Sequence, residues 1–200
     1  MSLFANAWSD VLQLVGPDHY LQACVDKASL ELYSAQIDDE SVCSTKGCNY
    51  AAWGGHFELL KWARQQGCVC DSITCTYAAE SGHLKLLKWV RAHGCRWDIW
   101  TCAYAARGGH IESLKWVRRQ GCKWSTWTCA YAAEGGHLEA LKWARQQGCD
   151  WDSWTCAFAA RSGHLEVLQW ARQQGCDWDS WTCARALDIT VLQLQQLVAD

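Results

Sequence analysis

The chain has 200 residues, half of them hydrophobic, and a formal net charge of −3 at pH 7. This size suits one globular domain or one array of repeats, and the slightly acidic balance excludes a general attraction to nucleic acid or anionic membranes. No run of about 18 apolar residues occurs, so no membrane-spanning helix is predicted. The first residues show neither a basic start nor a small-residue cleavage site, which predicts a cytoplasmic or nuclear protein. Its cysteines are then expected to be reduced. The expected oligomeric state is a monomer.

A block of 27 residues occurs five times in succession. The histidine of each block lies 27 residues after the previous one, at His56, His83, His110, His137 and His164. Self-similarity at a fixed period of this size indicates a stacked solenoid, in which each unit contacts only its neighbours. The repeats are taken as 47–73, 74–100, 101–127, 128–154 and 155–181, with helical caps predicted at 1–46 and 182–200.

Each repeat is predicted to be a pair of helices, illustrated by residues 128–154. Thr128–Glu134 is rich in alanine and predicts a short first helix with a narrow waist. The glycines at 135–136 end this helix, because glycine accepts a left-handed backbone. Apolar residues at helical spacing predict a second helix over about 137–147, which Gly148 closes. The predicted fold is therefore an all-α solenoid of about five stacked helix pairs.

Residues 149–154 connect the second helix to the next repeat. Asp152 or Ser153 can cap the helix that follows, since a side-chain oxygen there accepts from a free backbone N–H group. The connector carries a pair of tryptophans in four repeats, but in the first repeat Cys70 and Ile73 take their places. A first repeat is often atypical because one of its sides faces a cap.

The order Ala-Ala, Gly-His-Leu-Glu, Leu-Lys, Gly-Cys within each repeat resembles the ankyrin repeat, whose pattern is TPLHLAAxxGHLEVVKLLLxxGA. In the fourth repeat the matching letters fall on Ala132–Ala133, Gly136–Glu139, Leu141–Lys142 and Gly148–Cys149. The match recurs in register in all five repeats. The resemblance implies stacked helix pairs and a protein–protein interaction role, without catalysis.

The chain departs from that family in its connectors. Its period is 27 residues, whereas the ankyrin period is about 33. The missing residues lie where ankyrin repeats carry a projecting β-hairpin, so the hairpins are expected to be shortened or absent. The family's TPLH motif is replaced by Trp-Thr-Cys-Ala, as in Trp127–Ala130. The chain is similar to a short, Trp- and Cys-rich variety of ankyrin-like repeat common in large DNA viruses and some protists.

Residues 10–21 faintly resemble an F-box, a family that recruits ubiquitin-ligase scaffolds. The family's Leu-Pro start is missing, and residues 27–33 lack the expected tryptophan. This resemblance implies an alternative function, a substrate-recognition adaptor that docks through residues 10–35.

The cysteines and histidines have chemical and structural interpretations. Cys68, Cys70 and Cys75 come closest to a metal-binding pattern, but the spacing that recurs along the chain, as between Cys122 and Cys129, does not suit zinc. Buried thiols are expected, with disulfides across connectors as the alternative. Each imidazole is expected to bond to backbone groups at the turn between two helices. No catalytic, cofactor-binding or metal-ligating residue is predicted, because an active site is one unique constellation and these groups occur five times.

The tryptophans and the basic residues each allow a second reading. Paired connector tryptophans can stack on bases or sugars, but packing on each other and on adjacent repeats, as a small core that replaces the hairpin, is favoured.

Basic residues align along the second helices and interleave with glutamates, which favours a mixed, solvated face. Phosphate-backbone binding is the alternative, and a nucleic-acid-binding solenoid is the less favoured function. The aligned arginines are Arg64, Arg91, Arg118, Arg145 and Arg172.

Positions that vary between repeats are the candidates for contact with a partner. One series lies at the end of the first helix: Trp53, Glu80, Arg107, Glu134 and Arg161. The other lies at the start of the connector: Val69, Arg96, Lys123, Asp150 and Asp177. The connector charge changes from positive to negative along the array. The hypothesis is one extended protein-binding strip whose two halves prefer opposite charges.

Overall fold

The computed structural model describes residues 45–178, and in this range the chain forms α-helices and no β-strand. The all-α prediction is confirmed, and the projecting hairpins are absent from this range. The caps predicted at 1–46 and 182–200 lie outside the described residues, apart from residues 45 and 46, which begin the first described helix. None of the helices in the same range is long and apolar enough to cross a bilayer.

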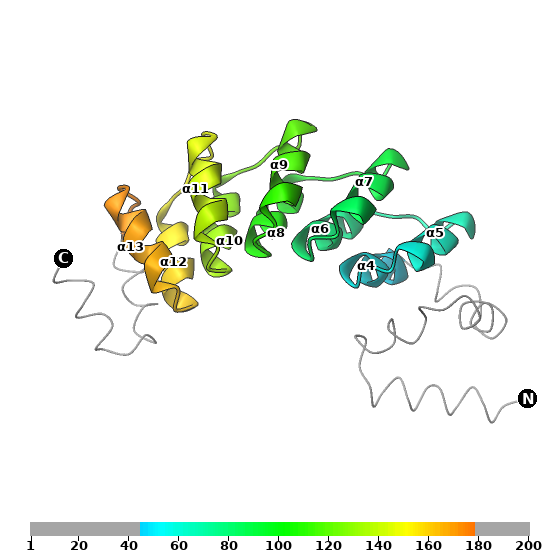
Figure 1. The fold of residues 1–200 in the computed structure, drawn as a ribbon, viewed down its shortest axis with the longest axis horizontal. Helices are drawn as coiled ribbons and strands as arrows, with labels where there is room; N and C mark the ends of the chain where they lie inside the picture. Colours follow the sequence, from blue (N-terminus) through cyan, green and yellow to red (C-terminus); the bar gives the residue numbers. More distant parts are fainter. Residues whose placement is uncertain (1–44, 179–200) are drawn as a thin grey trace, which may run out of the picture. The chain divides into compact units, whose positions relative to one another are not determined.

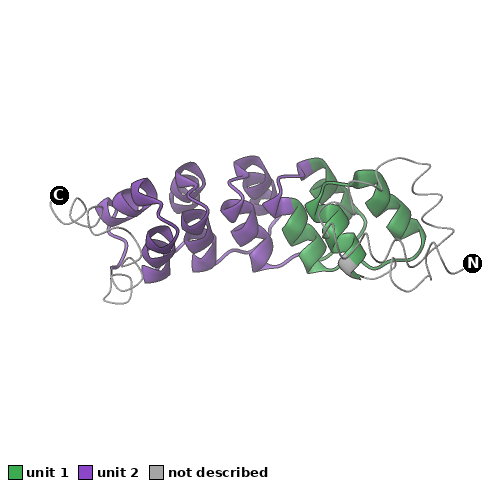
Figure 2. Cartoon of the chain, turned by 90° about the horizontal axis from the view of Figure 1, so that it is seen from below, with its two compact units in different colours: residues 1–78, 85–96 green, residues 79–84, 97–200 purple. Residues whose placement is uncertain are grey.

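The chain divides into two compact units, coloured separately in Figure 2. The first unit contains residues 1–78 and 85–96, and the second unit contains residues 79–84 and 97–200. The division passes through α6 and α7. Most of these two helices therefore belongs to the first unit, and the turn between them belongs to the second.

The first unit consists of two helix pairs among its described residues. Their bounds are α4 Thr45–Trp53, α5 Phe57–Gln65, α6 Ser72–Glu80 and α7 Leu84–Ala92. The Phe57 ring of α5 meets the Trp89 ring of α7 edge-on, with centroids 5.6 Å apart. Arg64 of α5 donates to the backbone carbonyl of His93, which follows α7, at 3.1 Å. These contacts join the second helices of the two pairs.

The second unit contains three complete helix pairs in the described range. Their bounds are α8 Ile99–Arg107, α9 Ile111–Arg119, α10 Thr126–Glu134, α11 Leu138–Gln146, α12 Ser153–Arg161 and α13 Leu165–Gln173. The first helix α10 packs between α8 and α12, and the second helices α9, α11 and α13 form an adjacent row (Figure 1). Each first helix also packs on the second helix that follows it.

The first helices are buried on most of their circumference because their residues are small. On α10 the buried residues are Thr128, Cys129, Ala130, Ala132 and Ala133, and all of them are fully inaccessible. Short side chains let neighbouring helix axes approach closely, while larger ones would hold them apart. The alanine-rich waist predicted from the sequence therefore explains how α10 fits between two helices.

Each first helix begins two residues earlier than predicted. α10 begins at Thr126 and not at Thr128, so Trp127 lies in its first turn and not in the connector. For α8 and α12 the side-chain cap explains the earlier start, whereas Ser125 before α10 makes no side-chain cap hydrogen bond. The carboxylate of Asp152, one of the two predicted caps, accepts a hydrogen bond from the backbone N–H of Trp154 at 3.1 Å. A side-chain cap at Asp152 fixes the start of α12 at Ser153, so Trp154 lies in the first turn of this helix.

The second helices are amphipathic, as predicted. α11 is one residue shorter at each end than expected, because His137 and Gln147 are its flanking caps. It buries Leu141 and Ala144. On its exposed side the Lys142 ammonium pairs with the Glu139 carboxylate at 3.0 Å. Pairs of this kind, three residues apart, contribute only a few tenths of a kcal/mol, about 0.2–0.5. Burial of the apolar stripe is therefore the larger contribution to the stability of these helices.

In the second unit, the rings of His110, His137 and His164 each pack against the glycine turn of the preceding repeat. A Cβ added to Gly109 would lie 2.4 Å from the ring of His137, and one added to Gly136 would lie 2.6 Å from the ring of His164. The His137 imidazole is hydrogen-bonded to the backbone of Arg107. The predicted bonding of imidazoles to backbone at the turn is thus confirmed for His137, with the partner in the preceding repeat. These histidines, with His83, form the histidine row.

The histidine row predicts that the protein is less stable at mildly acidic pH. Burial lowers the pKa of His110 and His137, and the neighbouring imidazoles lower it further. A histidine with a lowered folded pKa contributes stability above its unfolded pKa of about 6.5 and loses it as the pH falls through the folded pKa. Urea unfolding at pH 7.5 and 5.0 should therefore give a lower free energy of unfolding at pH 5.0.

The variant His137→Gln tests the origin of this pH dependence. Burial raises the pKa of Glu80, which acts in the opposite direction, so the total pH effect mixes several groups. The variant removes one histidine and leaves Glu80 in place. It should show a smaller loss of stability between pH 7.5 and 5.0 than the wild type. An unchanged loss would mean that the histidine row is not its source.

Candidate functional site

The first helices of the second unit leave one narrow stripe exposed. Helical spacing of i, i+4 and i+7 places two aromatic residues and one charged residue on this stripe of α8, α10 and α12, and most positions between them are buried. We name these nine residues the first-helix face: Trp100, Tyr104, Arg107, Trp127, Tyr131, Glu134, Trp154, Phe158 and Arg161.

Aromatic rings form the floor of the first-helix face. The centroid of Trp127 lies 6.0 Å from that of Trp100, and at the same distance from the equivalent tryptophan of the next repeat. Tyr131 stacks on Phe158 with centroids 6.0 Å apart and lies 5.2 Å from Tyr104. Aromatic pairs at such distances contribute about 0.5–1.5 kcal/mol beyond area burial. Each ring is therefore held by its neighbours in the adjacent repeats.

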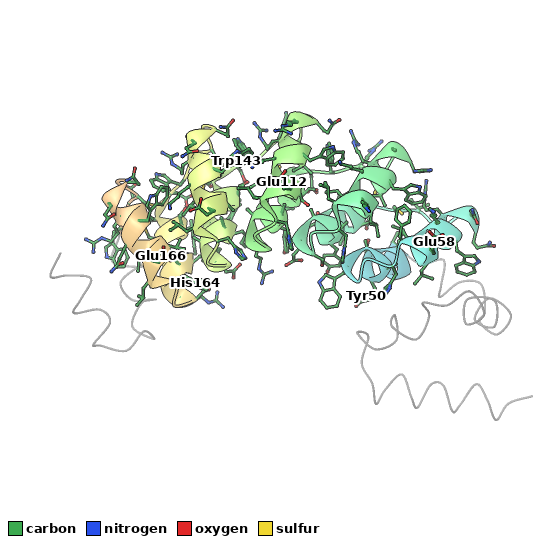
Figure 3. The ribbon with its side chains drawn as sticks, viewed as in Figure 1. Tyr50, Glu58, Glu112, Trp143, His164 and Glu166 are labelled. Atoms are coloured by element: carbon green, nitrogen blue, oxygen red, sulfur yellow. The ribbon has the colours of Figure 1, made fainter. Side chains whose placement is uncertain are left out.

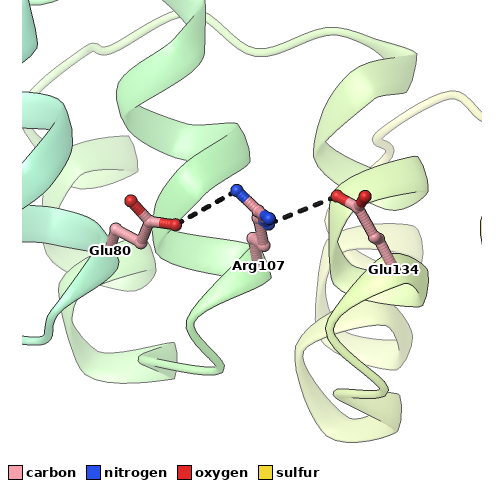
Figure 4. A network of polar contacts seen from close by, with 3 residues as sticks. All are labelled: Glu80, Arg107 and Glu134. Carbon is pink, nitrogen blue, oxygen red and sulfur yellow. Dashed lines mark hydrogen bonds and ion pairs between the residues drawn. The ribbon is translucent and has the colours of Figure 1, made fainter. Parts of the chain in front are cut away.

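A row of charged residues borders the aromatic floor. The Arg107 guanidinium lies between two carboxylates, 3.3 Å from Glu80 and 3.2 Å from Glu134 (Figure 4). It also lies 5.7 Å from the Tyr104 ring centroid and 5.9 Å from that of Tyr131. Burial raises the pKa of Glu80, and the positive charge of Arg107 opposes this shift. Three of the predicted partner-contact residues thus form one ionic network across three repeats.

The remaining predicted contact residues also lie at the surface. Trp53, at the end of α4, is 41% exposed, and Val69 in the first connector is 63% exposed. The other members of the two series that are exposed are Arg96, Lys123, Asp150, Asp177 and Arg161. Within the second unit the structure brings the helix-end residues together with the aromatic floor. The sequence analysis missed that floor, although the aromatic residues at i and i+4 before each charged position were a signal for it.

The described connector tryptophans pack on adjacent repeats, as expected, but the two members of a pair contribute to different surfaces and not to one small core. The second members Trp100, Trp127 and Trp154 lie on the first-helix face. The first member packs on a second helix: Trp124 meets Trp143 of α11, labelled in Figure 3, with centroids 5.9 Å apart. The guanidinium of Arg118 lies 3.8 Å from the Trp124 ring centroid. Since a guanidinium over an indole is attracted by the ring, this tryptophan is covered on one side by a cation.

A cleft lies beside the last two described second helices. Its volume is about 420 Å³, and its lining is Lys142, Arg145, Gln146, Trp151, Trp170 and Gln174. Arg145 lies 4.2 Å from the Trp151 ring centroid, and its guanidinium donates to the backbone carbonyl of Cys149. Part of the cation's hydrogen-bonding capacity is thus used within the protein. The aligned basic residues form a surface with mixed interactions, in agreement with the predicted solvated face.

The cysteines of residues 45–178 are free thiols, and the thiols that lie in contact are not the ones nearest in sequence. In the second unit the thiol of Cys129 contacts that of Cys149, twenty residues later, and not that of Cys122. Cys149 also donates to the backbone carbonyl of Ser125 at 3.3 Å. All cysteines in the described range are reduced, and all but Cys70 are buried. The same range contains no group of three or more histidine, cysteine or acidic side chains that could hold a metal ion, at Cys68, Cys70 and Cys75 or elsewhere.

Comparisons with known proteins agree with this architecture. Residues 129–172, which span α11 and α12 and most of α10 and α13, match a family model described as ankyrin repeats in many copies. The ankyrin-repeat domain of human ASB11, known from a crystal structure, is similar in fold, with a TM-score of 0.59 and 15% sequence identity. That match covers 76% of this chain and 82% of the ASB11 domain. No curated protein matches the sequence.

Ankyrin repeats are generally protein–protein interaction modules, and their helices serve as a scaffold for exposed side chains. In this chain the scaffold consists of buried alanines, leucines and thiols that recur in every described repeat. The exposed stripe of the first helices is therefore the part of the second unit in which aromatic and charged side chains are gathered in a fixed arrangement.

Proposed function

We propose that the protein is a non-catalytic module that binds a partner protein along the first-helix face and the adjoining connectors. The observation that carries this proposal is the aromatic floor bordered by the Glu80–Arg107–Glu134 network. Aromatic residues and arginine are enriched in protein interfaces and at the positions that contribute most to binding. Side chains already held by their neighbours lose little conformational entropy when a partner binds.

The proposed contact residues are those of the two variable series. The helix-end series is Trp53, Glu80, Arg107, Glu134 and Arg161, and the connector series is Val69, Arg96, Lys123, Asp150 and Asp177. The alternating charges of the helix-end series favour a partner that presents both signs of charge around an apolar centre. We propose a cytoplasmic monomer that uses these positions without a cofactor or metal.

The adaptor function is a second hypothesis for the same protein, because an adaptor also needs a substrate-binding surface. It depends on residues 10–35, which lie outside the described residues. Deletion of residues 1–46 distinguishes the two functions. A scaffold should keep its partners after this deletion, whereas an adaptor should keep the substrate bound at the repeats and lose the ligase subunit.

Two exposed arginines give a matched test of the proposed surface. Arg161 is the last residue of the first helix α12, and Arg119 is the last residue of the second helix α9. Arg161→Glu should weaken partner binding at least tenfold, because it reverses one charge on the first-helix face. Arg119→Glu makes the same change away from that face and should leave binding unchanged. The measurement is the yield of each co-purified protein, quantified by mass spectrometry against the wild type.

The outcome is decided by the difference between the two variants. Selective loss with Arg161→Glu supports the first-helix face. Equal retention of every partner in both variants, or selective loss with Arg119→Glu, would show that the partner does not contact this face. Both proteins must show wild-type helix content by circular dichroism.

A further inference from the structure

Cys70 departs from the repeat in identity and in exposure. The equivalent position is tryptophan in the following four repeats, at Trp97, Trp124, Trp151 and Trp178. In the described range every other cysteine is buried, whereas Cys70 is partly exposed. The residue before it, Val69, is 63% exposed. A reagent in solution therefore has access to this thiol and not to the other described thiols.

Three segments of the first unit converge on Cys70. The Thr74 hydroxyl donates to the side-chain carbonyl of Asn49 on α4 at 2.6 Å, which brings α4 against the start of α6. The thiol of Cys95 donates to the backbone carbonyl of Asp71 at 2.9 Å. Cys95 is thus held at the 70–71 backbone, and α4, which carries Cys48 next to Asn49, lies against the start of α6. The side chains agree with this placement, since the thiols of Cys48 and Cys95 are the two groups that lower the pKa of Cys70 most.

The arginine of α5 is held beside this group of thiols. Arg64 donates to the backbone carbonyl of Cys68 at 3.0 Å and to that of His93 at 3.1 Å, so its guanidinium is fixed between the two connectors. In the last three described repeats tryptophan takes the place of Cys70, and the equivalent arginine lies over its indole: Arg118 over Trp124, Arg145 over Trp151 and Arg172 over Trp178. In the first repeat the cation lies near a sulfur.

These contacts divide the thiols into one acidic member and two neutral ones. Hydrogen bonds from Cys48 and Cys95, with the charge of Arg64, lower the pKa of Cys70 to about 3. The same hydrogen bonds, with burial, raise the pKa of Cys48 and of Cys95. A thiolate is the form that reacts with electrophiles and peroxides, and reactive cysteines lie in partly exposed, electropositive surroundings next to a second thiol.

We propose that Cys70 is a site of oxidative modification, at which a peroxide oxidises the sulfur and Cys48 then closes a disulfide. In the first step the Cys70 thiolate attacks one peroxide oxygen. An S–O bond forms, the O–O bond breaks, and the released oxygen leaves as water after taking up protons. Cys70 is oxidised by two electrons to a sulfenic acid, and the peroxide is reduced.

In the second step the Cys48 sulfur attacks the sulfenic sulfur of Cys70. The S–S bond forms, the S–O bond breaks, and the hydroxyl group leaves as water with the Cys48 proton. Cys48 is the partner because the Cys95 sulfur is already engaged by the Asp71 carbonyl and by the Cys75 thiol. The disulfide would join α4 to the first connector and close the loop between residues 48 and 70.

The buried thiol pairs of the second unit provide an internal control. Cys129 and Cys149 are also in thiol–thiol contact, but both are fully buried. If contact between thiols were sufficient, this pair would oxidise as readily as Cys48 and Cys70. If the exposure of Cys70 and the fixed position of Arg64 determine reactivity, only the Cys48 and Cys70 pair is oxidised.

The test is site-resolved mass spectrometry on the full chain. Iodoacetamide should modify Cys70 at least tenfold faster than Cys129 at pH 6. The rate at Cys70 should stay constant between pH 5 and 8, whereas an ordinary thiol with a pKa of about 8.5 reacts about tenfold faster per pH unit. Hydrogen peroxide should produce a Cys48–Cys70 disulfide, and with Cys48→Ser it should leave a sulfenic acid at Cys70 that dimedone traps.

Two variants separate the loss of the disulfide from a loss of folding. Cys70→Trp restores the residue found in the other repeats and should abolish the disulfide while the helix content is retained. Cys129→Ser should leave it intact. A Cys70 alkylation rate equal to that of Cys129, a rate that rises with pH as for an ordinary thiol, or a Cys70 disulfide to a cysteine other than Cys48 would each overturn the proposal.

Discussion

Gly136→Ala is expected to destabilise the protein by several kcal/mol. Gly136 has a φ of +76°, and a Cβ there would lie 2.6 Å from the ring of His164. A side chain in the left-handed region costs about 1–2 kcal/mol. Forcing the half-buried imidazole aside costs about a further 1–3 kcal/mol, as for other overpacked sites. The measurement is the free energy of unfolding in urea, followed by circular dichroism.

Gly148→Ala is the matched control for this prediction. Gly148 has a similar φ of +80°, but a Cβ there meets no atom within 4 Å. Both substitutions reduce the entropy of the unfolded chain equally, so their difference isolates the contact with His164. Gly148→Ala should cost only the strain of the left-handed backbone. Equal losses in the two variants would mean that the histidine row does not hold adjacent repeats together.

The repeated architecture could be predicted because its causes are local. Each repeat contains alanines in its first helix, glycines at its turns and apolar residues at helical spacing in its second helix. These features indicate which residues of the same repeat are buried. The start of each first helix was harder to predict. The repeat pattern places Trp154 in the connector, whereas the Asp152 carboxylate accepts from the backbone N–H of Trp154 and so places this tryptophan in the first turn of α12.

The spacing of the cysteines along the chain did not predict their contacts. Cys122 and Cys129 of successive repeats are seven residues apart, but Cys129 contacts Cys149 of its own repeat, because the chain reverses at the glycine turn and α11 returns alongside α10. The ionic network did leave a signal. Glu80, Arg107 and Glu134 alternate in sign at intervals of 27 residues, as a row of ion pairs between adjacent repeats requires. The sequence analysis attributed this variation to a partner alone.

The same network affects how the proposed surface can act. Exposed ion pairs contribute little to stability, about 0–1 kcal/mol, so the network is not needed to hold the helices together. Its effect is to hold Arg107 over the tyrosines of two repeats. A partner therefore meets an arginine that is already oriented, and it competes with two carboxylates for that arginine. Specificity for a partner with correctly placed charges follows from this competition.

Leu141→Ala is expected to cost about 2–5 kcal/mol, the range found for leucines whose removal leaves a cavity. Leu141 of α11 is fully inaccessible, and so are its equivalents Leu60, Leu87, Leu114 and Leu168. α11 packs on α10 of its own repeat, and α10 is in turn enclosed by α8 and α12. Neighbouring helices cannot collapse into the cavity without losing their own contacts. The loss of stability should therefore lie in the upper half of that range.

Leu138→Ala on the same helix separates cavity formation from the loss of a leucine. Leu138 is only half-buried, so water can fill the space that the side chain leaves, and a smaller loss is expected. Urea unfolding of both variants gives the comparison. Each repeat of a solenoid is stable only through its neighbours. A Leu141→Ala protein that lost no more stability than Leu138→Ala would show that the stacked first helices alone carry the fold and that the second helices are dispensable.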